Sequence, residues 1–255
     1  MDTPLTTPAN LPQAWIDAYR RDGFIKIPGV ITKSEAETFR QAALDHQKQT
    51  EGRHMGGDVF TQIVNVWRDN ETMRRLTLHQ NLAAVASKLA GKSLRLWHDQ
   101  ILIKQPQRST PTEFHQDQPY WPHQNSPDPI SAWIALVDVP VERGCMSFIP
   151  GSHSRRDLPA QNLRDARSLF SISPDLQWEP RVTLPLKAGD CTFHHGRCAH
   201  MATPNLTDEP RVAHVVIFMD AATQYSGRKH IVTDPLGLSE GAPLDGELFP
   251  LRPGA

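Results

Sequence analysis

His115 and Asp117, in the run FHQDQPYWP, are two potential metal ligands separated by one position. On a β-strand, side chains alternate between the two faces, so residues two apart point to the same side. An imidazole and a carboxylate on one face could then bind a single ion as neighbouring ligands. Because the chain has 12 histidines, this pattern alone is only a weak indication of a metal site.

A second run, GDCTFHHGRCAHMATPNLTDEPRVAHVVIFMD, strengthens the indication. It predicts a strand ending in a histidine-bearing turn and a next strand that begins with Arg211, eleven residues after His200. Two imidazoles and one carboxylate form the facial triad of non-haem iron(II) oxygenases, which leaves three metal positions open. A keto acid such as 2-oxoglutarate would fill two of them and dioxygen the third. The far carboxylate of the keto acid needs a fixed planar cation such as Arg211.

The elements that would position these residues begin with a helical part. Residues 11–23 carry apolar side chains at helical spacing, and residues 32–49 open with Thr32 and Glu35 in capping-box register. An apolar stripe predicts a third helix over about residues 71–90. We therefore expect the first ninety residues to be helical and to support the remainder of the chain.

From Leu94 onward, short β-rich runs are broken by Pro, Gly and Asn, as is typical of a sandwich or barrel. We predict a mainly β protein with flanking helices, built as one domain over residues 1–255. Its parts would be mostly helical support over 1–92, a jelly-roll β core over 93–220 and a C-terminal extension over 221–255, whose tail 233–255 either packs on the domain or is loose.

The composition excludes several kinds of partner. A hydrophobic fraction of 38%, a charged fraction of 22% and a net charge of -1 lack the basic excess that nucleic acid or anionic membranes select. The start, MDTPLTTPANLP, has no leader-like apolar run, and no stretch approaches the roughly 18 apolar residues of a membrane span. A cytoplasmic protein with a small-molecule partner is predicted, with its oligomeric state left open. Cys145, Cys191 and Cys198 are expected to be buried and unpaired.

With these motifs, the chain resembles the phytanoyl-CoA dioxygenase-like branch of the 2-oxoglutarate oxygenases over roughly residues 15–220. The resemblance rests on HQD at 115–117, the strand with Trp133, GCMSFIPGSH at 144–153, the GDCTFHHG turn, and His200 followed by Pro204, Asn205 and Arg211. It implies a double-stranded β-helix, a cupin-like distorted jelly roll, with iron(II) inside the mouth of the barrel.

The resemblance also implies roles for single residues. His115, Asp117 and His200 would bind Fe(II), and Arg211 would anchor the co-substrate 2-oxoglutarate, in a pocket lined by Gln62, Gln100 and Trp133. The offset between His200 and Arg211 fits the family and favours His200 over His194 and His195 as the distal ligand. His195 would then pack or support the site.

One position departs from the family pattern. Gly and Ser usually follow the distal histidine, whereas this chain has Met201 and Ala202. The hydroxyl that would help to hold the keto acid is missing at Ala202, and whether Thr203 replaces it stays open at this point.

For the reaction, the resemblance implies a dioxygenase that hydroxylates an unactivated C–H bond of a small molecule and releases succinate and CO2. Desaturation, epimerisation and ring closure are alternatives, because they differ only in the fate of the substrate radical. Halogenation is disfavoured, since Asp117 is retained. A jelly-roll sensor or binding protein that holds metal without turnover is the alternative from another class.

The substrate is the least determined feature. Tyr120, Trp121 and His123 follow the metal motif and could contact a ring or sugar. The long irregular stretches 118–130 and 153–180 are predicted to frame the entrance as lids. Arg155 and Arg156 are a short basic pair for a coenzyme A thioester. Other residues are expected to have ordinary roles: His98, His153 and His214 as surface or hydrogen-bonded histidines, and Lys104 as a solvated strand-edge lysine.

Overall fold

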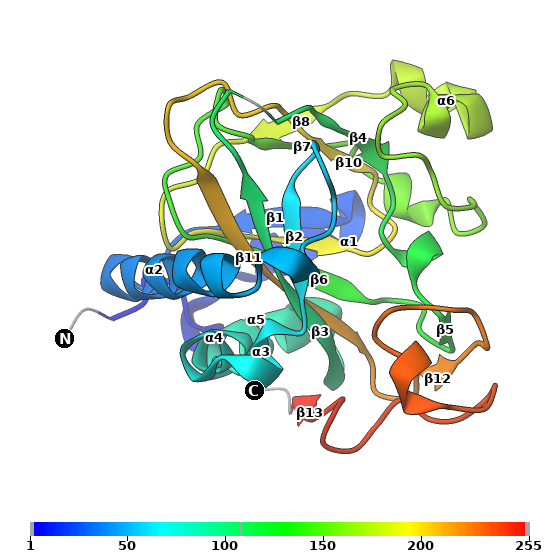
Figure 1. Ribbon diagram of the computed structural model, residues 1–255. Helices are drawn as coiled ribbons and strands as arrows, with labels where there is room; N and C mark the ends of the chain where they lie inside the picture. The colour runs from blue at the N-terminus through cyan, green and yellow to red at the C-terminus, as the bar shows by residue number, and fades with distance from the viewer. Residues whose placement is uncertain (1–2, 108, 253–255) are drawn as a thin grey trace.

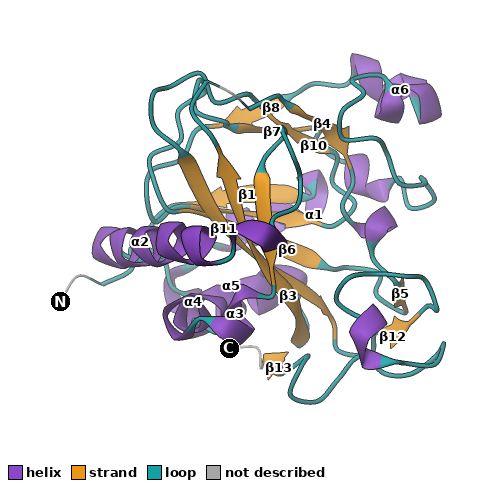
Figure 2. Cartoon of the chain, in the orientation of Figure 1, coloured by secondary structure: helices purple, strands orange, loops and turns teal. Residues whose placement is uncertain are grey.

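Two antiparallel sheets form the core of the computed structural model, which describes residues 3–107 and 109–252 (Figures 1 and 2). The larger sheet has the strand order β1-β9-β6-β11-β3-β13, with β2 also pairing with β3, and the smaller has the order β4-β10-β7-β8. The strands are β1 (Phe24–Ile27), β2 (Thr61–Val64), β3 (Leu94–Lys104), β4 (Thr112–His115), β5 (His123–Gln124), β6 (Ile130–Ala135), β7 (Met146–Phe148), β8 (Val182–Leu184), β9 (Cys191–His195), β10 (His200–Ala202), β11 (Arg211–Asp220), β12 (Gln224–Tyr225) and β13 (Leu251–Arg252). The predicted jelly-roll core with flanking helices is confirmed.

Helices from the N-terminal part cover one face of the larger sheet, and the smaller sheet lies across its other face (Figure 1). The helices are α1 (Gln13–Asp22), α2 (Lys33–Gln49), α3 (Val66–Asp69), α4 (Glu71–Thr77), α5 (Gln80–Ala90) and α6 (Ser168–Ile172). The predicted capping box of α2 is present, because Glu35 N–H donates to Thr32 Oγ1 at 3.1 Å and Thr32 N–H donates to Glu35 Oε2 at 2.8 Å.

The N-terminal part differs from the prediction in two ways. The single helix expected over 71–90 is wrong, because α4 and α5 are separated by Leu78 and His79, and His79 has extended backbone angles (φ -60°, ψ 121°). The first ninety residues also supply β1 and β2, which join the larger sheet through β9 and β3. These short segments become strands because they pair with strands distant in sequence, and local periodicity does not report such pairing.

Strand β11 lies at the centre of the larger sheet, and all ten of its residues are buried. Its side chains alternate between two apolar clusters: Val212 and Val216 pack under the helices, whereas Ala213, Val215 and Ile217 face the space between the sheets. A central strand covered on both faces explains its continuous apolar sequence. The inner face of this strand forms one wall of the space between the two sheets.

The C-terminal extension packs on the core rather than being loose. Its apolar side chains Tyr225, Val232, Leu244 and Phe249 are buried in the cluster between the sheets, and the Phe249 ring stacks on Trp97 with centroids 5.5 Å apart. Residues 253–255 of the predicted extension, like residues 1–2 of the predicted start, lie outside the described residues.

The three cysteines are buried and free, as predicted. Among the described residues, no helix has the length and apolar character needed to cross a membrane. The cytoplasmic location stays a prediction.

Candidate metal centre

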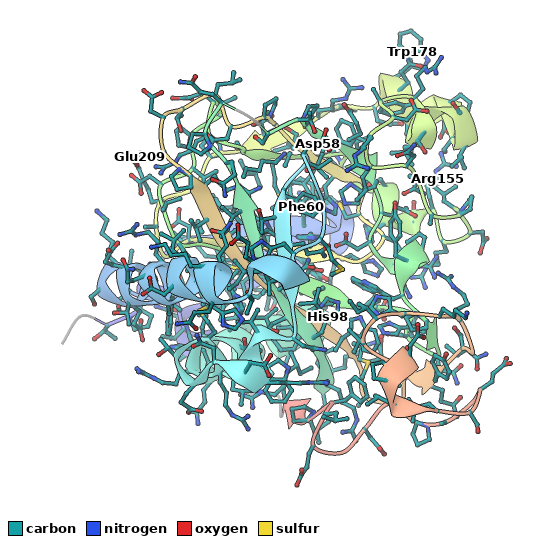
Figure 3. All side chains as sticks on the ribbon, viewed as in Figure 1. Asp58, Phe60, His98, Arg155, Trp178 and Glu209 are labelled. Carbon is teal, nitrogen blue, oxygen red and sulfur yellow. The ribbon has the colours of Figure 1, made fainter. Side chains whose placement is uncertain are left out.

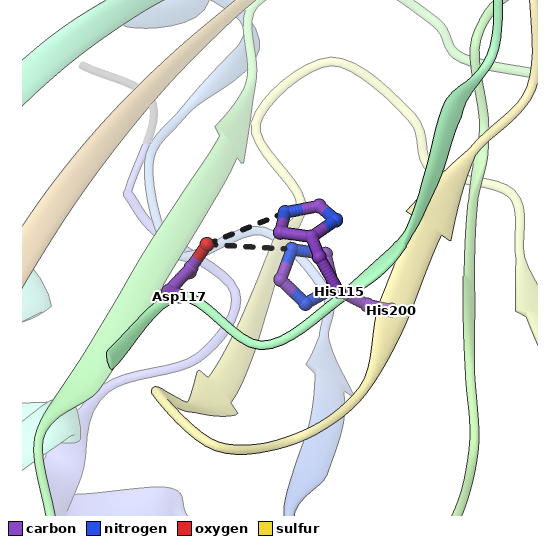
Figure 4. A group of neighbouring side chains, drawn as sticks. All are labelled: His115, Asp117 and His200. Carbon is purple, nitrogen blue, oxygen red and sulfur yellow. Dashed lines mark ion pairs between the residues drawn. The ribbon is translucent and has the colours of Figure 1, made fainter. Parts of the chain in front are cut away.

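Two histidines from neighbouring strands and one carboxylate converge between the sheets. His115 at the end of β4 is directly paired with His200 at the start of β10. Asp117 Oδ1 lies 3.4 Å from His115 Nε2 and 3.9 Å from His200 Nε2 (Figure 4). Ligand atoms at right angles and each about 2 Å from one ion are separated by about 3 Å. The three side chains therefore fit a single metal ion on one triangular face, as the sequence predicts.

The route by which Asp117 joins the cluster differs from the prediction. Strand β4 ends at His115, and Asp117 has helical backbone angles (φ -75°, ψ -45°) at the start of the short 3-10 helix Gln118–Tyr120. The two side chains meet because the chain turns after β4, not because they alternate along a strand. The residue between them, Gln116, is fully buried and holds this turn by donating from Nε2 to the carbonyl oxygens of Arg155 at 3.0 Å and Arg197 at 2.7 Å.

Backbone carbonyls orient both imidazoles. His115 Nδ1 lies 2.7 Å from the Glu113 carbonyl oxygen, and His200 Nδ1 lies 3.0 Å from that of Cys198. A carbonyl only accepts, so each Nδ1 carries the proton and each Nε2 presents its lone pair to the centre. Burial, together with the neighbouring His115, lowers the pKa of His200 to about 3, which keeps it neutral and ready to ligate.

His194 also belongs to the site, although the sequence did not identify it as a site residue. Its Nε2 lies 3.4 Å from Asp117 Oδ2, the oxygen that faces away from His115, and Ser131 Oγ donates to the same oxygen at 3.4 Å. Burial acts to raise the pKa of Asp117, but His200, His115 and His194 together hold it well below the usual range. The alternation of β9, in which His194 and Thr192 share a face, is the signal that could have identified it.

Arg211 is a buried guanidinium that has no acidic partner among the described residues. It is 2% exposed, donates from Nη1 to the Leu102 carbonyl at 3.2 Å and lies over the Trp133 ring at 5.2 Å. Its buried Nε has no hydrogen-bond partner, and no carboxylate of residues 3–107 or 109–252 forms an ion pair with it. Burial lowers its pKa to about 9. A buried cation of this kind fits a carboxylate ligand, because unpaired charges are costly inside a protein.

A cavity of about 370 Å³ joins the metal ligands to Arg211. Its lining includes five more residues that the sequence singled out, namely Gln62, Gln100, Tyr120, Trp121 and Trp133. Gln62 Nε2 donates to Gln100 Oε1, which fixes two of these side chains against each other. His123 does not line the cavity and instead packs edge-on against Trp97, with ring centroids 4.5 Å apart.

Further parts of the cavity wall were not anticipated. They come from the 55–60 turn, the stretch 153–180, the C-terminal extension and the inner face of β3, and they include Met55, Phe60, His98, Leu163, His230 and Ile231. Phe60 and His98 lie in the central part of the molecule, whereas Trp178 lies at its periphery (Figure 3). These segments are distant in the chain and carry no shared motif, so only the folded structure brings them together.

The missing hydroxyl at Ala202 is not replaced by Thr203. Ala202 lines the cavity, but Thr203 Oγ1 donates to the Val141 carbonyl at 2.7 Å and is not part of the lining. Thr112, which pairs with Ala202 across the two strands, is the hydroxyl-bearing residue in this part of the cavity wall.

Expectations for three other residues can be compared with the structure. Lys104 is not a solvated edge lysine, because it is 0% exposed and its Nζ donates to the carbonyls of Val59 at 3.1 Å and Thr110 at 2.6 Å. His214 is hydrogen-bonded as expected, with Nε2 2.9 Å from Thr77 Oγ1. His195 is also hydrogen-bonded, since its Nε2 lies 3.1 Å from the Pro127 carbonyl oxygen.

Comparisons with known proteins agree with this geometry. A solved structure of SnoK, described as a non-haem α-ketoglutarate-dependent carbocyclase from nogalamycin biosynthesis, is 41% identical, covers 98% of this chain and 99% of its own, and superimposes with a TM-score of 0.88. The epimerase SnoN, solved with Fe3+, α-ketoglutarate and nogalamycin RO, is 39% identical over 94% of this chain and 98% of its own, with a TM-score of 0.82.

Among curated proteins, phytanoyl-CoA dioxygenase domain-containing protein 1 of Mus musculus is 29% identical over 155 residues, which are 58% of this chain. The match spans about half, 53%, of that relative's length. The family model described as phytanoyl-CoA dioxygenase (PhyH) matches residues 19–213. The chain therefore belongs to the PhyH family of iron(II)- and 2-oxoglutarate-dependent oxygenases.

Proposed function

We propose that this oxygenase closes a carbocyclic ring in a small molecule of the nogalamycin type. The observation that carries the proposal is the 41% identity to the carbocyclase SnoK over 98% of the chain. This identity favours ring closure, which the sequence analysis named as an alternative, over hydroxylation, which was the default expectation. Epimerisation is the second candidate, because SnoN is 39% identical over 94% of the chain.

In this proposal His115, Asp117 and His200 hold the iron, and Arg211 pairs with the far carboxylate of 2-oxoglutarate beside Trp133. With dioxygen, the bound cofactors supply the oxidant that removes a hydrogen atom from the substrate while 2-oxoglutarate becomes succinate and CO2. The neutral His200 and the ionised Asp117 match this ligand role without a change of protonation.

The remaining task of the protein is to hold the substrate. Ring closure requires the substrate carbon that has lost its hydrogen to meet its partner atom before a hydroxyl group reaches it, so the substrate must be held in a fixed orientation. The aromatic walls Phe60, Tyr120 and Trp121 supply flat, rigid surfaces for a ring system, and they also reduce the access of water.

A coenzyme A thioester is a poorer match. Arg155 is paired with Asp175, and Arg156 Nη2 lies 3.7 Å from Asp128 Oδ1, so neither arginine is unpaired for a phosphate. The alternative of a binding protein without turnover is disfavoured by Arg211, which is buried in register with the metal ligands and lacks an anionic partner.

The test is product analysis with iron(II), 2-oxoglutarate, dioxygen and nogalamycin RO. Ring closure removes two hydrogen atoms from the substrate formula, whereas epimerisation leaves the formula unchanged and alters only the chromatographic retention. A product that has gained one oxygen atom would return the assignment to hydroxylation. Background succinate in iron-loaded, reduced protein, with and without this substrate, would support the binding-protein alternative.

A further inference from the structure

Two histidines at one end of the cavity have no part in the iron or 2-oxoglutarate sites. His98 lies on β3, and His230 lies in the C-terminal extension between β12 and the short 3-10 helix Asp234–Leu236. Both line the cavity, with ring centroids 6.0 Å apart and no hydrogen bond between them. His230 also lies beyond residues 19–213, which the family model matches, so this pair is not part of the family pattern.

A β-bulge directs His98 into the cavity. At the start of β3 the even-numbered residues Leu94 and Leu96 pack under the helices. Further along the strand the odd-numbered residues Ile101 and Ile103 do so instead. The alternation changes because the register with β11 shifts, with Ile217 opposite His98 and Phe218 opposite Leu96. Trp97 is the extra residue, and His98 and Gln100 therefore share the inner face. Bulges commonly redirect side chains in this way beside functional sites.

The hydrogen bonds of His98 define its tautomer. Its Nδ1 lies 3.1 Å from the Asp99 carbonyl oxygen, which can only accept, so Nδ1 carries the proton. The Nε2 atom of the neutral ring is then a hydrogen-bond acceptor. It has no hydrogen-bond partner among the described residues. It is also not enclosed by protein atoms, as expected for an atom that borders the cavity.

His230 has the opposite tautomer. The backbone N–H of Val232 donates to its Nδ1 at 3.2 Å, so Nδ1 is the acceptor and Nε2 carries the proton. The turn is firmly held, because His230 N–H donates to Asp234 Oδ1 at 2.9 Å and Val232 is 1% exposed. One fixed acceptor and one fixed donor thus border the same end of the cavity.

The surroundings keep both rings neutral, which the tautomer assignment requires. Burial, followed by the influence of His230, lowers the pKa of His98 to about 3, and burial lowers that of His230 to about 4. Asp117 and Asp234 act in the opposite direction, and Arg68 and Arg228 add to the lowering. The pKa of the adjacent His123 is also well below its ordinary value, because of burial and then His230 and His98.

We propose that His98 and His230 form a substrate-binding pair that takes one hydroxyl group of the substrate. The hydroxyl oxygen accepts from His230 Nε2–H, and the hydroxyl proton is donated to His98 Nε2. A ketone or an ether satisfies only His230, and therefore leaves the acceptor of His98 without a partner, which is costly in a desolvated site. The inference deepens the proposed function, on which it rests, by specifying a hydroxyl-bearing ring substrate in the cavity that Trp121 and Phe60 also line.

The experiment measures the binding of 2-naphthol and its methyl ether, 2-methoxynaphthalene, to anaerobic protein loaded with iron(II) and 2-oxoglutarate. The ether keeps the aromatic rings and the oxygen acceptor but has no proton to donate. We expect 2-naphthol to bind about five- to tenfold more tightly, the usual effect of one neutral hydrogen bond. His98→Phe should remove this preference. His230→Leu removes the donor to the oxygen atom that both compounds carry, so it should weaken the binding of both compounds and leave the preference. The matched control His79→Gln, on the helical layer, should keep it.

His98→Gln provides a second variant in case His98→Phe disturbs the bulge, because the amide oxygen can replace the Nε2 acceptor and should retain part of the preference. Equal affinity of the wild-type protein for the two compounds would overturn the inference, as would failure of 2-naphthol to bind, an undiminished preference in His98→Phe, or an unchanged affinity of His230→Leu for both compounds. Succinate formation by the wild-type protein tests the proposed function separately. Histidine-dependent binding without succinate would keep the pair and overturn the oxygenase reaction.

Discussion

Arg211 and Lys104 are directly paired residues of β11 and β3, yet only Arg211 lines the cavity. Gly144 approaches both side chains: a Cβ atom there would lie 3.0 Å from Arg211 Nε and 3.1 Å from Lys104 Cδ, and its φ of 73° also favours glycine. Burial, followed by the charge of Arg211, lowers the pKa of Lys104 to about 7. The two cations are thus separated in role, with Lys104 bound to backbone carbonyls and Arg211 left for a ligand.

Arg211→Lys should weaken 2-oxoglutarate binding by about tenfold or more and leave iron(II) affinity nearly unchanged. An ammonium cannot form the two parallel hydrogen bonds that a guanidinium forms with a carboxylate. Calorimetric titration of each ligand separates the two effects. Lys104→Met is the matched control and should keep 2-oxoglutarate affinity. If Lys104→Met lowers that affinity and Arg211→Lys does not, the anchor is Lys104.

Replacing His115 or Asp117 with Ala should reduce succinate formation from 2-oxoglutarate to background, with or without substrate. Each variant removes one of the three protein ligands, so the ion loses both charge neutralisation and a fixed geometry. Succinate measured by chromatography over time is the readout, with His79→Gln as the control. Full activity in either variant would mean that the ion lies elsewhere.

His194→Phe should weaken metal binding by about 10- to 100-fold, the usual cost of losing a group that orients a metal ligand. The variant removes the contact at 3.4 Å to Asp117 Oδ2 and leaves the three ligands in place. His194→Gln, which retains a donor, should recover part of the affinity. Titration with Mn(II), which avoids oxidation, provides the measurement. Equal affinities of all three proteins would show that Ser131 alone suffices to orient the carboxylate.

Residues 118–130 and 153–180 should gain protection from hydrogen exchange when substrate binds. Tyr120 and Trp121 of the first stretch and Leu163 of the second line the cavity, and Tyr120 Oη donates to the Gln161 carbonyl, so the two stretches are linked at the entrance. Exchange followed by mass spectrometry, with and without bound substrate, provides the measurement. High protection that does not change on binding, in a fully active protein, would identify them as rigid packing loops.

His214→Gln should become more stable relative to wild type as the pH falls below about 6.5. Burial lowers the pKa of His214 to about 3, so in wild type the unfolded chain binds a proton near pH 6.5 that the folded protein excludes. Wild-type stability is therefore lost between these two pH values, by up to about 1.4 kcal/mol per pH unit. Burial raises the pKa of the neighbouring Asp99 to about 7, but that residue is present in both proteins.

Urea unfolding of both proteins at several pH values between about 4 and 8 gives the difference in free energy of unfolding. A difference that does not vary with pH would mean that burial does not shift the pKa of His214 on folding.

The sequence by itself determined the metal ligands and the class of fold, and it identified Arg211 as the candidate anchor of 2-oxoglutarate. His115 and Asp117 are close along the chain, and His200 and Arg211 belong to one pair of successive strands, so their spacing reports the geometry almost directly. The short β-rich runs from Leu94 onward, broken by Pro, Gly and Asn, likewise indicate a β core, because burial of one or both faces selects the residues of each strand.

Only the tertiary structure decided where Lys104, His98, His194 and His230 lie. The ammonium of buried Lys104 donates to the carbonyls of Val59, which is distant in sequence, and of Thr110 in the following loop, and strand periodicity reports neither partner. The alternation of side chains along β3 changes at Trp97, because its pairing with β11 shifts register there. Periodicity along β3 alone therefore places the residues on one side of the bulge on the wrong face of the sheet. His230 reaches the cavity because the extension packs over Trp97. These contacts depend on the free energy of packing segments far apart in sequence, which spacing along one segment does not encode.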